Sequence, residues 1–327
     1  MEKVKLFYHN HCFDGAVSVA LMQIFLQEYY HKKYFVEYIP LVHAPGFSYD
    51  KRMFVADINV ILDFVYPGCC EVQWWFDHHP TTFLNHEDRK KFENNNYKGH
   101  YQWSPAADST TIVIKDYLNK KFNFSFSKEL NKLIDWVSII DSACFSSPEI
   151  MVEILEPAPA FAIILGLSQN DELASKFIKD LVALQSLEKM SRKPYWSKKI
   201  NEIRQQNWDL IEDIKENMQI INRIAVINLG NKEANGYNKF IPYYLDSTIL
   251  YAITLLKYEN SFKISLSANP WDDMVINGES HDIGKLCKEH GGGGHFAVGG
   301  ISFTEKKDAQ LTLELIIKTL KEKPVKS

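Results

Sequence analysis

The sequence predicts an α/β protein, with a parallel sheet first, then a helical connector, and a smaller mixed α/β domain at the end. Two observations support this class. Short apolar runs alternate with a stretch of helical spacing over the first 80 residues, and strand-like patterns return near residue 223. Strands that alternate with helices are typical of parallel sheets covered on both faces. The 327 residues are enough for two cores of ordinary size.

Three apolar runs near the start are expected to be strands: "VKLFYH" (4–9), "RMFVADIN" (52–59) and "EVQWWFDHH" (71–79). The segment "AVSVALMQIFLQEYYH" between the first two has the apolar spacing of a helix. Each run leads into acidic or imidazole side chains. Because ligands bind beyond the carboxyl ends of parallel strands, we expect these side chains to form one site.

The middle of the chain is expected to be helical. "SPAADSTTIVIKDYL" predicts a helix with Ser104 as its N-cap and Pro105 at the first helical position. "KELNKLIDWVSIIDSACF" predicts an amphipathic helix that runs into Asp141, and residues 160–215 are mostly helical in pattern. These patterns place the parallel-sheet domain at 1–160, the helical connector at 161–215 and the last domain at 216–327.

The last domain is expected to contain strands at "RIAVINL" (223–229), "FKISLSA" (262–268) and "GGISF" (299–303). Between the first two, "STILYAITLLKY" (247–258) has a helix-like apolar pattern, and we expect it to lie in the core.

Charge and cysteine content narrow the function. A net charge of −4 gives no general attraction to long nucleic acid or to acidic membranes, and so favours a short substrate. Five cysteines without CxxC spacing indicate a reducing cytoplasm. The N-terminus lacks the apolar region of a signal peptide. Charged residues and prolines interrupt the most apolar stretch, around residues 151–167, so we expect a soluble cytoplasmic protein without a membrane span.

A set of carboxylates and imidazoles near the predicted strand and helix ends could bind metal: His9, His11, Asp14, Asp57, Asp77, His78, His79 and Asp141. Such ligands suit Mn²⁺, Mg²⁺, Co²⁺ or Fe²⁺ better than structural zinc. Two ions about 3.5–4 Å apart could share a bridging carboxylate, as in many phosphoryl-transfer enzymes. A single aspartate after a strand is usually a turn or cap residue. The repetition after three strand-like runs favours a metal site.

Four segments together resemble the DHH phosphoesterase superfamily. They are "FDHHP", an aspartate at the end of an upstream strand, "IIDSACF" and the late "GGGGHFAVGG", and the resemblance covers about residues 4–303. That superfamily includes RecJ-type exonucleases, oligoribonuclease and phosphoadenosine-phosphate phosphatases, cyclic-dinucleotide phosphodiesterases and family II pyrophosphatases. The resemblance implies a metal-dependent phosphodiesterase, with one or two Mn²⁺, Mg²⁺ or Co²⁺ ions, and a DHH-associated domain that holds the end of the substrate.

Carried over position by position, the resemblance implies roles for individual residues. Asp57 would bridge the metals, Asp77 would orient the triplet, and His79 would face the substrate phosphate. The implied metal ligands are His9, Asp14, Asp57, Asp77, His78 and Asp141, and the implied catalytic residues are Asp77, His78 and His79. The implied substrate-binding residues are His79, Gly292, Gly293, Gly294 and His295, with Asn269 where some relatives have an arginine.

The first motif, "HNHCFDG", departs from the superfamily pattern. Cys12 stands where an aspartate is usual, and His9 is one residue closer than expected, so His9 or His11 could be the ligand. A thiolate there could select a softer ion or leave the site weak. The alternative is a buried thiol that packs beneath the loop.

Basic residues with interspersed aromatics mark the connector: Lys189, Arg192, Lys193, Tyr195, Trp196, Lys198, Lys199, Arg204 and Trp208. These could attract phosphates and stack bases. A solvated helix face with aromatics packed inward is the alternative that we favour.

The predicted function is hydrolysis of short oligonucleotides to mononucleotides, an exonuclease activity, by metal-bound hydroxide. One alternative is a phosphohydrolase acting on a cyclic dinucleotide or on 3′-phosphoadenosine 5′-phosphate. The other is a catalytically weak nucleotide-binding protein. A homodimer is compatible with the sequence.

Overall fold

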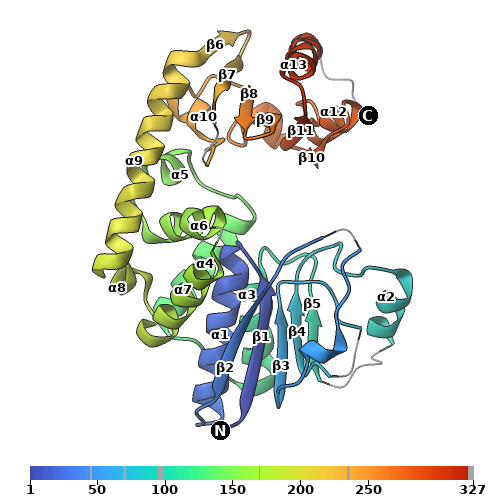
Figure 1. Cartoon of the computed structure of the whole chain (residues 1–327), viewed down its shortest axis with the longest axis vertical. Helices are drawn as coiled ribbons and strands as arrows, with labels where there is room; N and C mark the ends of the chain where they lie inside the picture. Colours follow the sequence, from blue (N-terminus) through green and yellow to red (C-terminus); the bar gives the residue numbers. More distant parts are fainter. Residues whose placement is uncertain (45, 69–70, 95–98, 169, 234–235, 323–327) are drawn as a thin grey trace. The chain divides into compact units, whose positions relative to one another are not determined.

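The structure is a computed structural model that describes residues 1–44, 46–68, 71–94, 99–168, 170–233 and 236–322. Cys69 and Cys70 lie outside the described residues. The chain forms two compact units, and Figure 1 labels most of their elements. The first unit comprises Met1–Phe145 and Glu156–Asn201, and the second comprises Ser146–Leu155 and Glu202–Ser327. The boundaries predicted at residues 160 and 215 stay predictions.

The first unit contains a five-stranded sheet in the order β2-β1-β3-β4-β5, in which all neighbouring strands are parallel. This confirms the predicted class. The strands are β1 (Lys3–His9), β2 (Phe35–Leu41), β3 (Ile58–Leu62), β4 (Trp74–Asp77) and β5 (His100–Trp103). The strand predicted at 52–59 is wrong. A 3₁₀ turn, η1 (Lys51–Met53), occupies its start, and β3 begins only at residue 58.

Helix α1 (Phe13–Tyr29) follows β1 and is buried at every residue from Phe13 to Leu26. It packs on β1 and β3, and it also contacts α3 (Thr110–Phe122) and α4 (Lys128–Asp141). On the other face of the sheet, Trp75 of β4 belongs to an aromatic cluster with Phe64 and Tyr66, which lie in the loop after β3. The sheet is therefore covered on both faces, by helices on one and mainly by loop aromatics on the other. Its central strands are nearly continuous apolar runs for this reason.

The remaining helices of the first unit are α2 (His86–Glu93), α6 (Pro157–Leu167), α7 (Asp171–Leu184), α8 (Leu187–Ser191) and the start of α9 (Pro194–Asn217). The predicted start of the helix after β5 is wrong. Ser109, not Ser104, caps α3, because its hydroxyl accepts the amide of Ile112, whereas Ser104 belongs to a preceding turn. The helix predicted to run into Asp141 is confirmed as α4.

The second unit contains a six-stranded sheet in the order β10-β11-β9-β8-β7-β6, in which only β7 and β8 pair in parallel. The strands are β6 (Met218–Ile221), β7 (Ile224–Glu233), β8 (Tyr251–Tyr258), β9 (Ser261–Ala268), β10 (Gly293–His295) and β11 (Val298–Phe303). Three of them match predicted strands. The helix-like run at 247–258 is the strand β8 instead, although its predicted place in the core is confirmed. A run buried on both faces does not alternate, so its pattern does not distinguish strand from helix.

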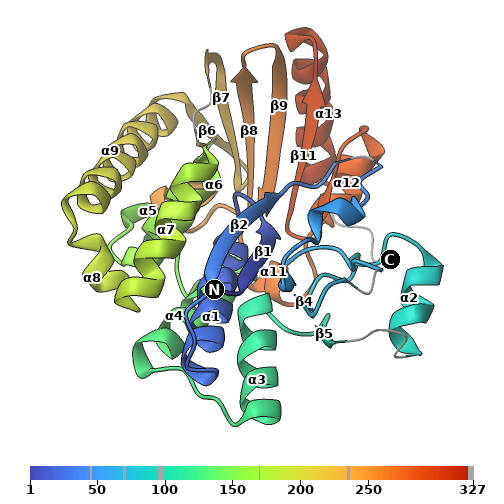
Figure 2. The ribbon, with the colours of Figure 1, turned by 60° about the horizontal axis from the view of Figure 1, so that its bottom comes forward.

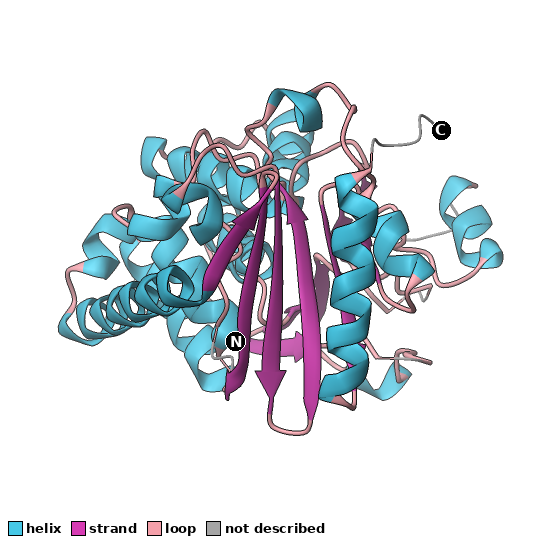
Figure 3. Cartoon of the chain, turned by 90° about the horizontal axis from the view of Figure 1, so that it is seen from above, coloured by secondary structure: helices cyan, strands magenta, loops and turns pink. Residues whose placement is uncertain are grey.

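Helices α5 (Glu149–Glu153), α10 (Ile241–Leu245), α11 (Asp273–Ile276), α12 (Ile283–Glu289) and α13 (Lys306–Lys321) complete the second unit. Figure 2 shows α13 alongside β9 and β11, and Figure 3 shows the long strands of this sheet in magenta beside a helix. Leu286 from α12 and Ile316 from α13 join the sheet residue Leu255 in one core. Within the described ranges, no helix is long and apolar enough to cross a bilayer.

Candidate metal centre

Polar side chains from three strands meet at the carboxyl edge of the first sheet. His9 ends β1, Asp63 directly follows β3, and Asp77 ends β4 just before His78 and His79. In the strand order β2-β1-β3-β4-β5, the connections from β1 and β3 diverge, which opens a crevice for ligands at that point. Asp14, in the first turn of α1, and Asp141, at the end of α4, join the same cluster.

Asp14 is held by the start of α3. The amides of Thr110 and Thr111 donate to its two carboxylate oxygens, at 2.6 and 3.0 Å. A helix N-terminus favours an anion there. Burial, with the nearby Asp63 and Asp141 carboxylates, nevertheless raises the pKa of Asp14 well above its usual range.

Gly15 allows α1 to start beside the end of β1. A Cβ at this position would collide with the carbonyl oxygen of His9. The loop before it turns sharply, with His11 in the left-handed region at φ 57°. His9 faces the cluster, whereas His11 is exposed and lies 3.2 Å from the Asn10 amide. The structure therefore places His9, not His11, among the candidate ligands.

The aspartate of the second strand is Asp63, not the predicted Asp57. Asp57 precedes β3 and accepts the backbone amide of Lys3 at 2.7 Å, so it lies at the opposite edge of the sheet. Six residues of extended chain separate the two positions by about 20 Å. Asp63 was missed because the strand was predicted at residues 52–59, whereas β3 spans Ile58–Leu62. The signal was present in "NVILD", a continuous apolar run that ends in a carboxylate.

Asp63 is almost completely buried and faces several cluster members. The hydroxyl of Thr110 donates to its Oδ1 at 3.0 Å, whereas its Oδ2 has no hydrogen-bond partner among the described residues. Burial and the nearby Asp77 carboxylate raise the pKa of Asp63 to about 7. A carboxylate in this state is strongly stabilised by a bound cation.

Asp77 orients the histidine pair. Its Oδ1 accepts the amides of His78 and His79, at 2.8 and 3.3 Å, and it lies 2.8 Å from Nδ1 of His79. That hydrogen bond to Asp77 raises the pKa of His79 and outweighs the opposing effect of burial. Asp77 lies outside the groups whose ligand atoms converge, so its position supports the predicted orienting role more than metal ligation.

His78 presents one nitrogen to the carboxylates. Its Nδ1 lies 3.0 Å from the carbonyl of Ala107, and a proton shared there leaves the lone pair of the neutral ring on Nε2. Nε2 is 3.1 Å from Asp141, 3.8 Å from Asp63 and 3.9 Å from Asp14. Burial lowers the pKa of His78, but the interactions with Asp141 and Asp14 outweigh it and raise the pKa to about 10.

Asp141 ends helix α4, at the negative end of the helix dipole. An acid at this position is unfavourable for the helix, by about 0.3–1 kcal/mol at an exposed site. Its carboxylate, together with the terminal carbonyls, instead creates a negative potential that attracts a cation.

Three groups of side chains in the described part of the chain have ligand atoms within 4.8 Å of one another: His9, Cys12 and Asp63; Asp63, His78 and His79; and Asp14, His78 and Asp141. Buried atoms without hydrogen-bond partners among these residues are His9 Nδ1 and Asp63 Oδ2. Burial and the nearby His79 lower the pKa of His9, which keeps its ring in the neutral, ligating form. Imidazole and carboxylate donors suit divalent ions, so the residues present fit a metal centre.

Apart from His79, the predicted substrate residues lie in the second unit. In the β10–β11 hairpin, Gly292 precedes β10, Gly293 and Gly294 lie within that strand, and His295 ends it with an exposed side chain. Side chains at Gly292 and Gly294 would collide with the carbonyls of Gly300 and Val298, so the hairpin itself requires glycine there.

The side chain of Asn269, which was predicted to bind substrate, makes hydrogen bonds within the fold. The side chain is buried, donates to the carbonyl of Ile249 at 2.9 Å, and accepts the amide of Trp271 at 3.0 Å. Asn269 therefore stabilises the turn after β9.

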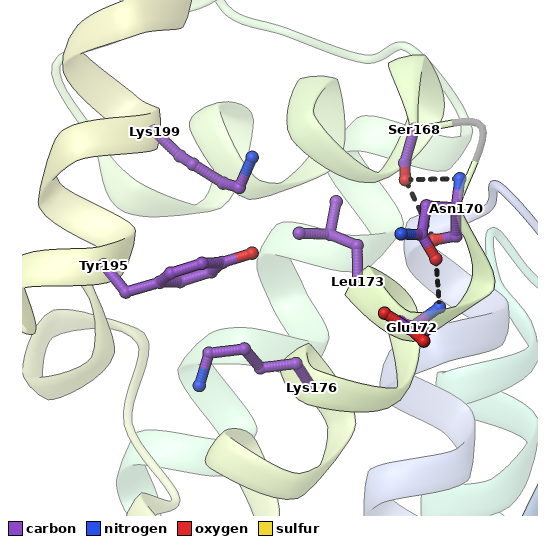
Figure 4. Close-up of a pocket in the computed structure, with 7 residues that line it drawn as sticks. All are labelled: Ser168, Asn170, Glu172, Leu173, Lys176, Tyr195 and Lys199. Atoms are coloured by element: carbon purple, nitrogen blue, oxygen red, sulfur yellow. Dashed lines mark hydrogen bonds between the residues drawn. The ribbon is translucent and has the colours of Figure 1, made fainter.

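The helical part of the first unit holds a cavity of about 400 Å³ (Figure 4). Tyr195 projects into it between Lys176 and Lys199, whose ammonium groups lie 4.9 and 5.6 Å from the ring centroid. Of the connector's aromatic residues, Trp196 is completely buried, as expected for an aromatic packed inward, whereas Tyr195 and Trp208 are exposed. Asp171, in the first turn of α7, accepts a hydrogen bond from the side-chain amide of Asn10 at 2.7 Å, which connects α7 to the loop after β1.

No protein-family model matches the sequence, and no curated protein matches it significantly. Among solved structures, the chain resembles the pGpG-specific phosphodiesterase PggH from Vibrio cholerae, with a TM-score of 0.68 and 18% identity over 98% of this chain and 99% of that chain. It also resembles an exopolyphosphatase-related protein from Bacteroides fragilis, with a TM-score of 0.51 and 16% identity over 98% and 94% of the two chains. These likenesses confirm the fold expected from the DHH resemblance.

Proposed function

We propose that the protein is a metal-dependent phosphodiesterase that hydrolyses short oligonucleotides to mononucleotides. One observation carries this proposal: carboxylates and imidazoles converge at the carboxyl edge of the parallel sheet, and buried, unpartnered ligand atoms of His9 and Asp63 face one another. The resemblance in fold to a phosphodiesterase specific for pGpG, a linear dinucleotide, supports the substrate class.

The residues that would hold metal are His9, Asp14, Asp63, His78 and Asp141. When bound there, Mn²⁺, Mg²⁺ or Co²⁺ would activate a water for attack at phosphorus and neutralise phosphate charge. Thr110 fixes both Asp14 and Asp63, and Ala107 fixes the ring of His78, so these side chains need little reorganisation on binding.

His79 is the residue we assign to the substrate phosphate. Its side chain is 36% exposed, so it can reach a ligand, while Asp77 holds its Nδ1. The raised pKa of His79 favours the protonated ring, which can donate a hydrogen bond to a phosphate oxygen and stabilise the charge that develops there.

The exposed glycine hairpin and His295 are proposed to bind the terminal nucleotide through backbone amides and the imidazole. The net charge of −4 also favours short substrates over long strands. A homodimer and a cytoplasmic location stay predictions.

The test is hydrolysis of labelled pGpG by the EDTA-treated protein, with and without added Mn²⁺. We expect release of mononucleotide only with metal, and its loss in His78→Asn and Asp141→Asn variants that keep the wild-type circular dichroism spectrum. Asp57→Asn is the matched control, since Asp57 lies outside the cluster. No release by the wild type with Mn²⁺, Co²⁺ or Mg²⁺ would contradict the proposal.

The alternative substrates are distinguished in the same assay. Faster turnover of a cyclic dinucleotide, or of 3′-phosphoadenosine 5′-phosphate, would redirect the proposal to those phosphohydrolases. Tight nucleotide binding without any turnover would instead favour a catalytically weak binding protein.

A further inference from the structure

We propose that Cys12 is a metal ligand, and that its thiolate joins His9 and Asp63 in a site that prefers a softer ion than the site of Asp14, His78 and Asp141. This inference rests on the metal centre of the proposed function. It assigns a distinct chemical preference to each half of that centre.

The position of Cys12 directs its side chain toward the cluster. Cys12 is the residue immediately before α1. Its backbone starts the helix, because the carbonyl accepts the amide of Ala16 at 3.1 Å. The ligand atoms of Cys12, His9 and Asp63 lie within 4.8 Å of one another.

Two buried atoms of this group lack partners, which points independently to a ligand. His9 Nδ1 and Asp63 Oδ2 are 3.4 Å apart, and neither has a hydrogen-bond partner in the part of the chain that the structure describes. Buried polar atoms are rarely left in this state, because they lose hydration without compensation. A divalent ion between the imidazole, the carboxylate and the thiolate would satisfy both.

Asp63 is placed to serve both halves of the centre. Its Oδ2 faces His9, whereas its Oδ1 lies 3.8 Å from Nε2 of His78. The side containing Cys12 offers one sulfur, one imidazole and one carboxylate. The other side offers two further carboxylates and the imidazole of His78. Thiolates favour Zn²⁺ and similar softer ions, whereas carboxylates suit Mn²⁺ and Mg²⁺, so the two sides should differ in metal preference.

Metal binding at Cys12 is an exchange of a proton for the ion. The S–H bond breaks, a sulfur–metal bond forms, and the proton passes to solvent, so no oxidant or reductant is needed. If the thiol instead only packs beneath the loop, its replacement should leave metal affinity unchanged.

The test titrates the full-length EDTA-treated protein with Co²⁺ alone and with Zn²⁺ alone. We expect a near-ultraviolet sulfur-to-cobalt charge-transfer band in the wild type and in the control Cys144→Ser, whose thiol is exposed. The band should be absent in Cys12→Ser and Cys12→Asp. The Zn²⁺ affinity should fall at least about tenfold in Cys12→Ser, the lower end of what changes around a metal ligand typically cost. Cys12→Asp should shift the preference from Zn²⁺ toward Mn²⁺ by a similar factor.

Retention of both the band and the Zn²⁺ affinity in Cys12→Ser would overturn the inference, while Mn²⁺-dependent hydrolysis by the wild type would leave the proposed function intact. Failure of the wild type to bind any of these ions would overturn both. Circular dichroism establishes that each variant is folded, and Cys12→Asp provides a second reading if Cys12→Ser does not fold.

Discussion

Replacing Asp63 with asparagine should stabilise the metal-free protein and abolish stabilisation by metal. In the folded chain the pKa of Asp63 is about 7, against an ordinary value of 3.8. The folded state therefore binds the proton more tightly than the unfolded state. The resulting loss of folding stability is negligible below about pH 4, grows as the pH rises toward 7, and reaches its full value above pH 7. At 1.36 kcal/mol per pKa unit, the cost reaches about 4 kcal/mol near pH 8 and about 2 kcal/mol near pH 5.5.

The asparagine in Asp63→Asn carries no charge at any pH. Urea unfolding in EDTA should therefore show that the variant is more stable than the wild type near pH 8, and that this advantage is smaller near pH 5.5. The value of about 4 kcal/mol is an upper bound, because the new amide must itself find partners. Saturating Mn²⁺ at a hundredfold excess over Kd should stabilise the wild type by about 2.7 kcal/mol and the variant very little. Asp57→Asn should respond to Mn²⁺ like the wild type. A variant that is less stable than the wild type in EDTA at both pH values would refute the reasoning from buried charge.

Further substitutions test the elements that position the centre. Thr110→Val removes the hydrogen bond to Asp63 but keeps the amide bond to Asp14, so kcat on pGpG should fall about 10–100-fold in a variant that stays folded by circular dichroism. An unchanged kcat would exclude this positioning role. Gly15→Ala should prevent normal folding, because the added methyl group would collide with the carbonyl oxygen of His9. The measurement is thermal unfolding, which should lose its cooperativity; a melting curve like that of the wild type would contradict the close approach. Asn269→Ala should lower the free energy of unfolding by about 1–3 kcal/mol in urea, because it leaves buried backbone groups unpaired. The KM for pGpG should stay unchanged; a raised KM at unchanged stability would instead support the predicted contact with substrate.

Much of the first unit could be predicted because strand ends carry their own signals. The segments leading to His9 and to Asp77 both pass directly from apolar to polar residues, and the helix before Asp141 is clearly amphipathic. The error at Asp57 arose where two polar breaks flank one apolar run. In "FVADINVILDF" only the pairing with β1 shows which aspartate follows the strand.

Other features depend on contacts that are distant in sequence. The role of Thr110 requires knowing that α3 begins beside Asp14, 96 residues earlier. Likewise β8 is a strand because β7 and β9 flank it, and its apolar run alone is compatible with either structure. The glycine segment was predicted to bind substrate, and the structure adds that the hairpin itself requires glycine for close backbone packing.

The second unit draws on two separated pieces of chain, and this affects any attempt to excise it. Within it, the side chain of Asn207 donates to the carbonyl of Val152, and that of Asn238 donates to the carbonyl of Met151 at 2.8 Å. An expression fragment that begins at Glu202 would lack both acceptors and the short helix that carries them. A soluble truncation of this unit therefore needs residues 146–155 fused ahead of α9, through a linker that replaces the intervening helices.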